Sequence, residues 1–174
     1  MKKVPLTELD PRLQKQITAA DQQLKANPQY AVEVLTGILV RNPGCIEVRR
    51  TLRKAQKALH GTKKGLFDGI TGALTSGKIA KSVEADPLAA IAAAEEVLAK
   101  KPIDANANKT IALAAIKLEF HELAAFAYEE LCTNEPTEIQ HFVDLANVWI
   151  AAGENDNALN AADKGLKLFP GNGD

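Results

Sequence analysis

Prolines and alanines recur in this chain at matching intervals, and this repeat constrains the fold more than any other feature. Three prolines follow one another in steps of 34 residues, and a fourth lies 59 residues before the first of them: Pro43, Pro102, Pro136 and Pro170. The same steps separate four alanines, each twelve positions before a proline: Ala31, Ala90, Ala124 and Ala158. A fixed period in this range is typical of chains built from stacked structural repeats.

Apolar residues follow each alanine with the spacing of one helix face. After Ala31, offsets of 1, 4, 7 and 8 carry an apolar set: Val32, Leu35, Ile38 and Leu39. These offsets place side chains on one side of an α-helix. Proline disfavours helical geometry in the residue before it, so a helix is predicted to end near each proline.

A second apolar stripe precedes each of these helices. In the last copy it consists of Phe142, Leu145, Ala146 and Trp149, and in the copy before it of Ile111, Ala112, Ala115 and Leu118. Asp10-Pro11 and Asp86-Pro87 predict helix N-caps, and Thr137 with Gln140 predicts a capping box. Gly61 and Gly153 are expected to end helices. Each 34-residue unit is therefore predicted to be a helix, a short turn and a second helix.

The pattern resembles the tetratricopeptide repeat (TPR). The family's small residue at the start of the second helix matches the four alanines, and its closing proline matches the four prolines. Its aromatic place in the first helix holds Trp149 and its turn glycine Gly153, whereas its early Trp place holds Phe142 in the last copy and Asn108 in the copy before. The resemblance covers roughly residues 12–60 and 71–170.

This resemblance implies an all-α fold, a right-handed α-solenoid of stacked antiparallel helix pairs interrupted by a Gly-rich insertion. We predict an N-terminal module over 1–60 with one helix pair and a third helix, a linker over 61–70, and a C-terminal module of about three helix pairs over 71–174. One hairpin cannot bury its own apolar face, so neighbouring repeats share a core. Alanine at the seam lets helix axes approach closely.

The insertion has two interpretations. It combines apolar residues (Leu66, Phe67, Ile70 and Leu74) with flanking lysines (Lys63, Lys64, Lys78 and Lys81). Such a segment could bind a membrane surface, which makes a membrane-surface or self-assembling adaptor built on residues 61–81 an alternative function. Its glycines weaken a helix, so we favour Phe67 and Ile70 packing on the interrupted stack.

Charge is divided unevenly along the chain, although the total is −1. Residues 49–81 contain nine basic residues and one acidic residue, whereas residues 119–163 contain ten acidic residues and no Lys or Arg. The two stretches are either solvated faces or surfaces for partners of opposite sign. Nucleic-acid binding through 49–81 is a weaker alternative because stacking aromatics are scarce there.

The sequence gives no case for an enzyme, a cofactor or a metal site. The histidines, His60, His121 and His141, are dispersed and have no carboxylate partner at catalytic or metal-ligand spacing. The pairs Glu95-Glu96 and Glu129-Glu130 are adjacent on helices and are expected to be solvated. Cys45 and Cys132 form no CxxC pair and fit a reducing compartment. No signal peptide or membrane-spanning stretch is evident, so we expect a cytoplasmic protein.

The resemblance places ligand binding in a groove lined by the first helices. Carried over residue by residue, the groove places nominate Arg50, Lys54, Lys57, Asn106, Lys109 and Asn147. The three basic residues form one helical stripe, and the asparagines could pair with a peptide backbone. The predicted function is therefore a non-enzymatic scaffold that binds a protein or peptide partner, acidic or ending in a carboxylate, although the family's full carboxylate-clamp pattern is absent.

The predicted last helix ends at a repeat boundary near Phe169 and Pro170. Solenoids usually cover their last apolar face with a polar capping helix, and none is evident here. We therefore expect this face to meet a partner, to self-associate, or to continue into further sequence of a longer protein.

Overall fold

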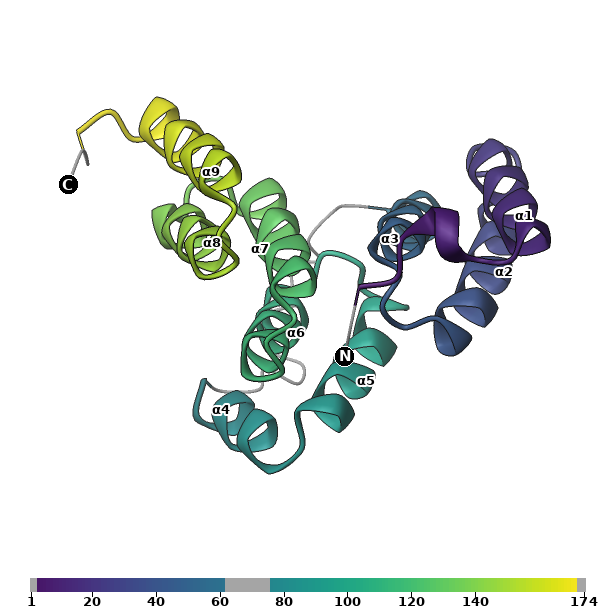
Figure 1. The fold of residues 1–174 in the computed structure, drawn as a ribbon, viewed down its shortest axis with the longest axis horizontal. Helices are drawn as coiled ribbons and strands as arrows, with labels where there is room; N and C mark the ends of the chain where they lie inside the picture. The colour runs from purple at the N-terminus through teal and green to yellow at the C-terminus, as the bar shows by residue number, and fades with distance from the viewer. Residues whose placement is uncertain (1–2, 62–75, 172–174) are drawn as a thin grey trace. The chain divides into compact units, whose positions relative to one another are not determined.

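The computed structural model describes residues 3–61 and 76–171, and within them every regular element is helical (Figure 1). A short 3-10 turn (Leu6–Glu8) is followed by helices α1 (Pro11–Gln22), α2 (Pro28–Arg41), α3 (Ile46–His60), α4 (Ser76–Ala85), α5 (Pro87–Leu98), α6 (Ala105–Lys117), α7 (His121–Asn134), α8 (Ile139–Ala151) and α9 (Asn155–Leu168). The predicted behaviour of the linker, of Phe67 and Ile70, and of the start of a helix at residue 71 lies outside the described residues.

Contacts divide the chain into two compact units. The first comprises Met1–Gly72 with Glu95–Asp104, and the second comprises Ala73–Ala94 with Ala105–Asp174. Helix α5 therefore contributes its last turn to the first unit and its earlier residues to the second. The module boundaries at 60 and 70 stay a prediction from the sequence.

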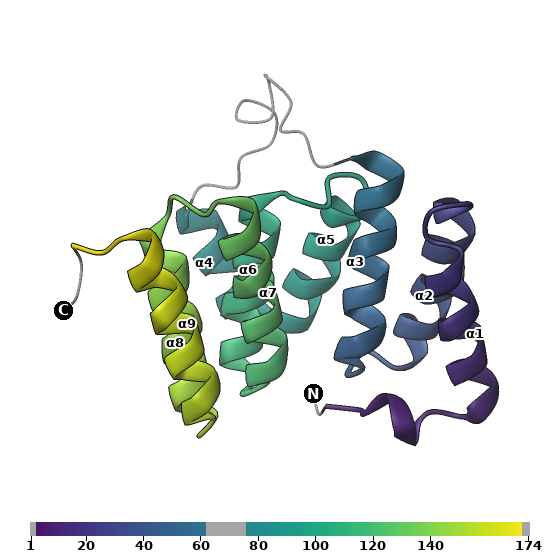
Figure 2. The same cartoon turned by 90° about the horizontal axis from the view of Figure 1, so that it is seen from above.

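The first unit is built on α2, which packs against both α1 and α3 (Figure 2). Its core joins residues of all three helices, and the most deeply buried of them are Ala20, Ala31, Leu35, Cys45, Val48 and Ala55. The amide of Val4 donates to the carbonyl of Gly44 at 3.0 Å, which ties the N-terminal segment to the turn after α2.

From α6 to α9, the second unit is a run of consecutive packed helices. Helix α6 packs on α7, α7 on α8 and α8 on α9, and α4 packs on α6. Ala124 and Ala158, predicted as seam residues, are both buried, as are Ala31 and Ala90. The described residues thus confirm an all-helical fold of successive packed helix pairs, as the sequence predicts.

Three second helices end in the same geometry. The residue before the closing proline has φ and ψ of −131° and 63° at Asn42, −134° and 63° at Glu135, and −131° and 69° at Phe169. Proline excludes helical geometry from the preceding residue, so each helix stops there. The recurrence of one conformation before Pro43, Pro136 and Pro170 explains why the prolines mark the repeat so clearly.

The predicted helix starts are partly confirmed. Asp10 accepts the amide of Arg12 at 2.7 Å, and Asp86 accepts the amides of Leu88 and Ala89 at 3.0 Å, so both are N-caps. The capping box at Thr137 is wrong. Helix α8 begins at Ile139 with Glu138 at the N-cap and no side-chain cap, so Thr137 lies in the turn before the cap, and the Gln140 side chain donates to Asp144 instead.

Candidate functional site

The first helices of the repeats present matching outward places. By the steps of 59 and 34 residues, four places on α3 align with four on α6 and four on α8. They hold Glu47, Arg50, Lys54 and Lys57 on α3, then Asn106, Lys109, Leu113 and Ile116 on α6, then Gln140, Val143, Asn147 and Ile150 on α8. Ten of these twelve side chains are exposed, and the other two, Lys57 and Leu113, are half-buried.

On α3 the outward face is basic. Arg50 and Lys54 are exposed and Lys57 is half-buried, and their spacing of four and three residues places them in one stripe. Glu47, one turn before Arg50, is the acidic member of the set. This stripe belongs to the first unit and is suited to hold carboxylates.

On α6 and α8 the outward faces are apolar and amide-rich. Asn106, Lys109 and Asn147 are exposed as predicted. Large apolar side chains accompany them, with Ile150 60% exposed and Ile116 and Val143 also exposed. Both helices pack against α7 in the second unit. The six predicted residues therefore fall into two sets, three on α3 and three on α6 and α8.

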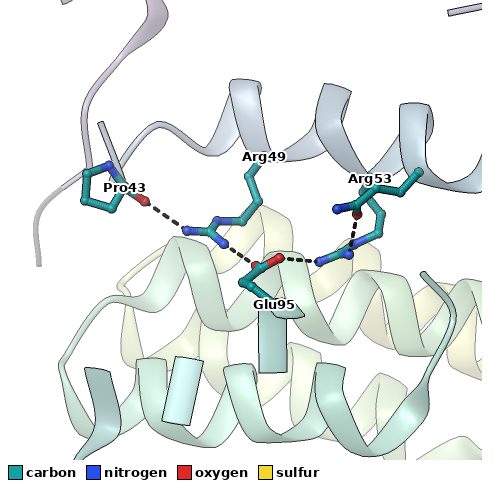
Figure 3. Close-up of polar contacts among 5 residues, drawn as sticks. Pro43, Arg49, Arg53 and Glu95 are labelled. Atoms are coloured by element: carbon teal, nitrogen blue, oxygen red, sulfur yellow. Dashed lines mark hydrogen bonds and ion pairs between the residues drawn. The ribbon is translucent and has the colours of Figure 1, made fainter. Parts of the chain in front are cut away.

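The sequence interpretation missed a buried polar cluster on the inner face of α3 (Figure 3). Arg49 and Arg53 are 3% and 2% exposed, and both pair with Glu95 of α5 within the first unit. Arg53 donates to Glu95 Oε2 at 3.2 Å and to Gln56 Oε1 at 2.6 Å. Arg49 also donates to the carbonyl of Pro43 at 3.1 Å. The cluster links α3 to α5 and to the turn that closes α2.

The repeat register contains the signal that identifies this cluster. The inner places of α6 and α8 hold mostly apolar residues, whereas those of α3 hold Arg49, Leu52, Arg53 and Gln56. Charged groups at core places require a buried partner of opposite charge. The expectation that Glu95 is solvated is therefore wrong, because its carboxylate faces two guanidinium groups.

The same contacts change the basic stretch at 49–81. Two of its nine basic residues, Arg49 and Arg53, lie in the interior and are paired with Glu95. Their charge does not reach the surface that a nucleic acid would meet. The nucleic-acid alternative is therefore weaker, because it rests on the number of basic residues in this stretch.

One histidine does have a carboxylate neighbour. His141 Nε2 lies 3.2 Å from Glu135 Oε2, joining the first turn of α8 to the end of α7. The expectation that no histidine pairs with a carboxylate is wrong here, because the turn between α7 and α8 brings residues six apart together. Among residues 3–61 and 76–171, no group of three or more His, Cys, Asp or Glu side chains could hold a metal ion.

The cysteines are poor nucleophiles in this environment. Burial raises the pKa of Cys45, and burial raises the pKa of Cys132 to about 11. Both thiols are therefore protonated at neutral pH. No helix in the described part of the chain is long and apolar enough to cross a bilayer.

Comparisons with known proteins add little to this description. No protein-family model matches the chain, and no curated protein matches it. Among solved structures, the chain is similar to a thermophilic TPR protein of Thermus thermophilus, with 18% identity and a TM-score of 0.41 over 96% of this chain and 79% of that one. A TM-score this low does not establish a shared fold, so the assignment of paired helices rests on the contacts described above.

Proposed function

We propose that this chain is a TPR-like, non-enzymatic scaffold that binds a segment of a protein partner on the outward faces of its first helices. The observation that supports this most directly is the exposure of Ile116 and Ile150 at one register place on α6 and α8. Large apolar side chains that recur on one exposed face mark interaction surfaces more often than isolated ones.

The two units suit different parts of a partner. Arg50, Lys54 and Lys57 on α3 would meet carboxylates, either acidic side chains or a chain terminus. Asn106, Lys109 and Asn147 would pair with backbone groups beside an apolar contact made by Ile116, Val143 and Ile150. Each unit by itself therefore favours one kind of ligand group, carboxylates on α3 and apolar side chains on α6 and α8. We also propose a cytoplasmic location and the module boundaries predicted from the sequence, with modules over 1–60 and 71–174.

The test uses fluorescein-labelled peptides that contain leucine and glutamate, each with either a free or an amidated C-terminus. Fluorescence anisotropy should show binding to the wild-type chain, weakened by salt. The double variant Arg50→Glu/Lys54→Glu should lose binding while its helical circular dichroism stays unchanged.

A matched control is Lys25→Glu/Lys100→Glu, which makes the same change in charge at exposed lysines away from the stripe. It should bind as the wild type does. Equal loss in both double variants would mean that the peptides sense only net charge, and the proposed site on α3 would be wrong. Ile150→Asp tests the apolar face in the same assay and should weaken binding of these peptides, but not of matched peptides in which each leucine is replaced by serine.

A further inference from the structure

Helix α9 carries an exposed apolar stripe on a face that α7 buries. In the 34-residue register, Leu159, Ala162 and Leu166 of α9 hold the places of Ala125, Tyr128 and Cys132 of α7. Ala125 is fully buried and Tyr128 nearly so, whereas Leu159 is 62% and Leu166 42% exposed. The sequence predicts that these offsets face the core, so α9 departs from the prediction.

The contacts of α7 show which neighbour covers the equivalent face of that helix. Helix α7 packs on α8, and burial together with the Asp144 carboxylate of α8 raises the pKa of the Tyr128 hydroxyl. The charge of Asp144 also acts on Cys132. The stripe is therefore the face on which a second helix receives the first helix of the next repeat. On α9 the equivalent face is exposed, with leucines at the places of Ala125 and Cys132 and the smaller Ala162 at the place of Tyr128.

A complementary hollow lies in the first unit, between α1 and α2. It is an open groove of about 230 Å³ lined by Leu13, Gln16, Tyr30, Val34, Gly37 and Arg41, among others. Counting 93 residues from Ala31 to Ala124, the places of Tyr30 and Val34 on α7 are Leu123 and Ala127, both fully buried. On α2 the same places are less covered, since Tyr30 is 40% exposed and Val34 is half-buried, and both border the groove.

We propose that this chain associates head to tail, with Leu159 and Leu166 of α9 in one copy entering the α1–α2 groove of a second copy. The protruding leucines fit a hollow bordered by Leu13, Tyr30 and Val34. Burying exposed apolar side chains in an apolar groove is the main source of stability at such contacts.

Charge selects the same occupant. Asp156 and Asp163 are exposed on α9, three and four residues from Leu159, so they flank the stripe. Arg41 lines the groove, and exposed Arg12 lies on α1 one turn before the groove residue Gln16. Glu33 in the groove and exposed Lys167 on α9 offer a second pair of opposite charges, in which the groove residue is the acidic one. Opposite charges at the rim favour this docking and make it sensitive to salt.

The contact is heterologous, because two different surfaces meet. Such a contact leaves one groove and one stripe unused in every dimer, so it adds further copies unless the rotation closes a ring. Sedimentation equilibrium of the full chain should therefore show an average mass above 18.7 kDa that rises with protein concentration and falls with added salt.

Two blocked variants test the pairing of surfaces. Leu159→Glu places a charge in the stripe. Gly37→Glu places one in the groove, where the Cβ of the new side chain would meet nothing within 4 Å. Each variant alone should be monomeric, with association weakened at least about tenfold. An equimolar mixture should form a 1:1 dimer, since one variant keeps the stripe and the other keeps the groove. Leu168→Glu is the control: it is also exposed on α9 but lies off the stripe, and it should associate as the wild type does.

Several outcomes would overturn the proposal. A wild-type chain that stays monomeric at all concentrations would do so, and so would a mixture of the two variants that gives no dimer. If Gly37→Glu still associates while Leu159→Glu does not, α9 meets α9 of the other copy and the head-to-tail arrangement is wrong. Circular dichroism checks that each variant is folded. Leu159→Ser and Gly37→Gln replace any variant that is not.

Discussion

Helix α3 and helices α6 and α8 occupy the same place in the repeat but use it differently. On α3 the inner places hold Arg49, Arg53 and Gln56, joined to Glu95, whereas α6 and α8 fill them mainly with Ala, Ile, Leu and aromatic residues. Both arrangements are buried. The repeat therefore fixes which residues face inward, while the chemistry of the inner face varies from one unit to the other.

The outward places differ in the same sense. Those of α3 are mostly charged, and those of α6 and α8 are mostly amide and apolar. The face on α3 is suited to charged ligand groups, and the faces on α6 and α8 are suited to apolar ones. Substitutions at equivalent places test this difference between the two units.

The largest effect is expected at the charged inner face. Glu95→Ala leaves two buried guanidinium groups without their shared carboxylate, and removing one partner of a buried pair costs about 3–5 kcal/mol. Urea unfolding followed by circular dichroism measures this loss. Its neighbour Glu96 is exposed, and Glu96→Ala should stay within about 0.5 kcal/mol of the wild type. Equal effects of the two substitutions would contradict the cluster.

A second difference is the reactivity of Cys132, which lies on α7 near Asp144 of α8. Its pKa of about 11 lies above the value of 9.0 expected for an exposed thiol, so at pH 8 the thiolate fraction falls about a hundredfold. Iodoacetamide should label Cys132 slowly in the native chain and rapidly in urea. Because the folded-state pKa is raised, the protonated thiol favours the folded state below pH 9.0, and this contribution disappears as pH rises towards 11. Fast labelling at pH 8 would show that the seam is open.

The alanine seam should behave alike in both units. Ala31→Phe and Ala124→Phe each insert a ring at a fully buried place, and such overpacking costs about 1–3 kcal/mol. Thermal unfolding of the two variants gives the comparison, with Ala93→Phe on an exposed place of α5 as the control. An unchanged melting temperature for either seam variant would place its helix in another register.

The smallest effect separates two helical glycines. At Gly37 an added Cβ meets nothing within 4 Å, so Gly37→Ala should raise stability by up to about 1 kcal/mol through helix propensity. At Gly165 the same Cβ would come within 3.1 Å of the Phe142 Cβ, so Gly165→Ala should gain less or lose stability. Chemical denaturation resolves the sign. A larger gain at Gly165 than at Gly37 would contradict the close packing of α9 on α8.

The sequence predicts the helices well because the repeated residues, proline and alanine, act on the helix that they follow or lie in. The proline after each second helix and the small residue at its start act within one turn, and the structure bears both out. The Arg49–Glu95 cluster depends on residues 46 positions apart, so no local pattern shows it. The capping box at Thr137 is wrong for a local reason, since the N-cap is Glu138 and Gln140 donates to Asp144 one turn along α8. The exposure of Leu159 and Leu166 on α9 could not be predicted from the apolar pattern. The pattern shows which side chains share a helix face, but not whether another helix covers that face.

The most direct test of the shared register is thiol labelling at equivalent places of the three first helices. Single cysteines at Leu52, Ile111 and Leu145 report the inner faces, and single cysteines at Arg50, Lys109 and Val143 report the outward faces, in a background with Cys45→Ala and Cys132→Ala. All three inner residues are buried and all three outward residues are exposed. The outward set should be labelled at nearly the rate of the unfolded chain, and the inner set at least about a hundredfold more slowly. Equal rates for the two sets, or a reversed order on any one helix, would contradict the register.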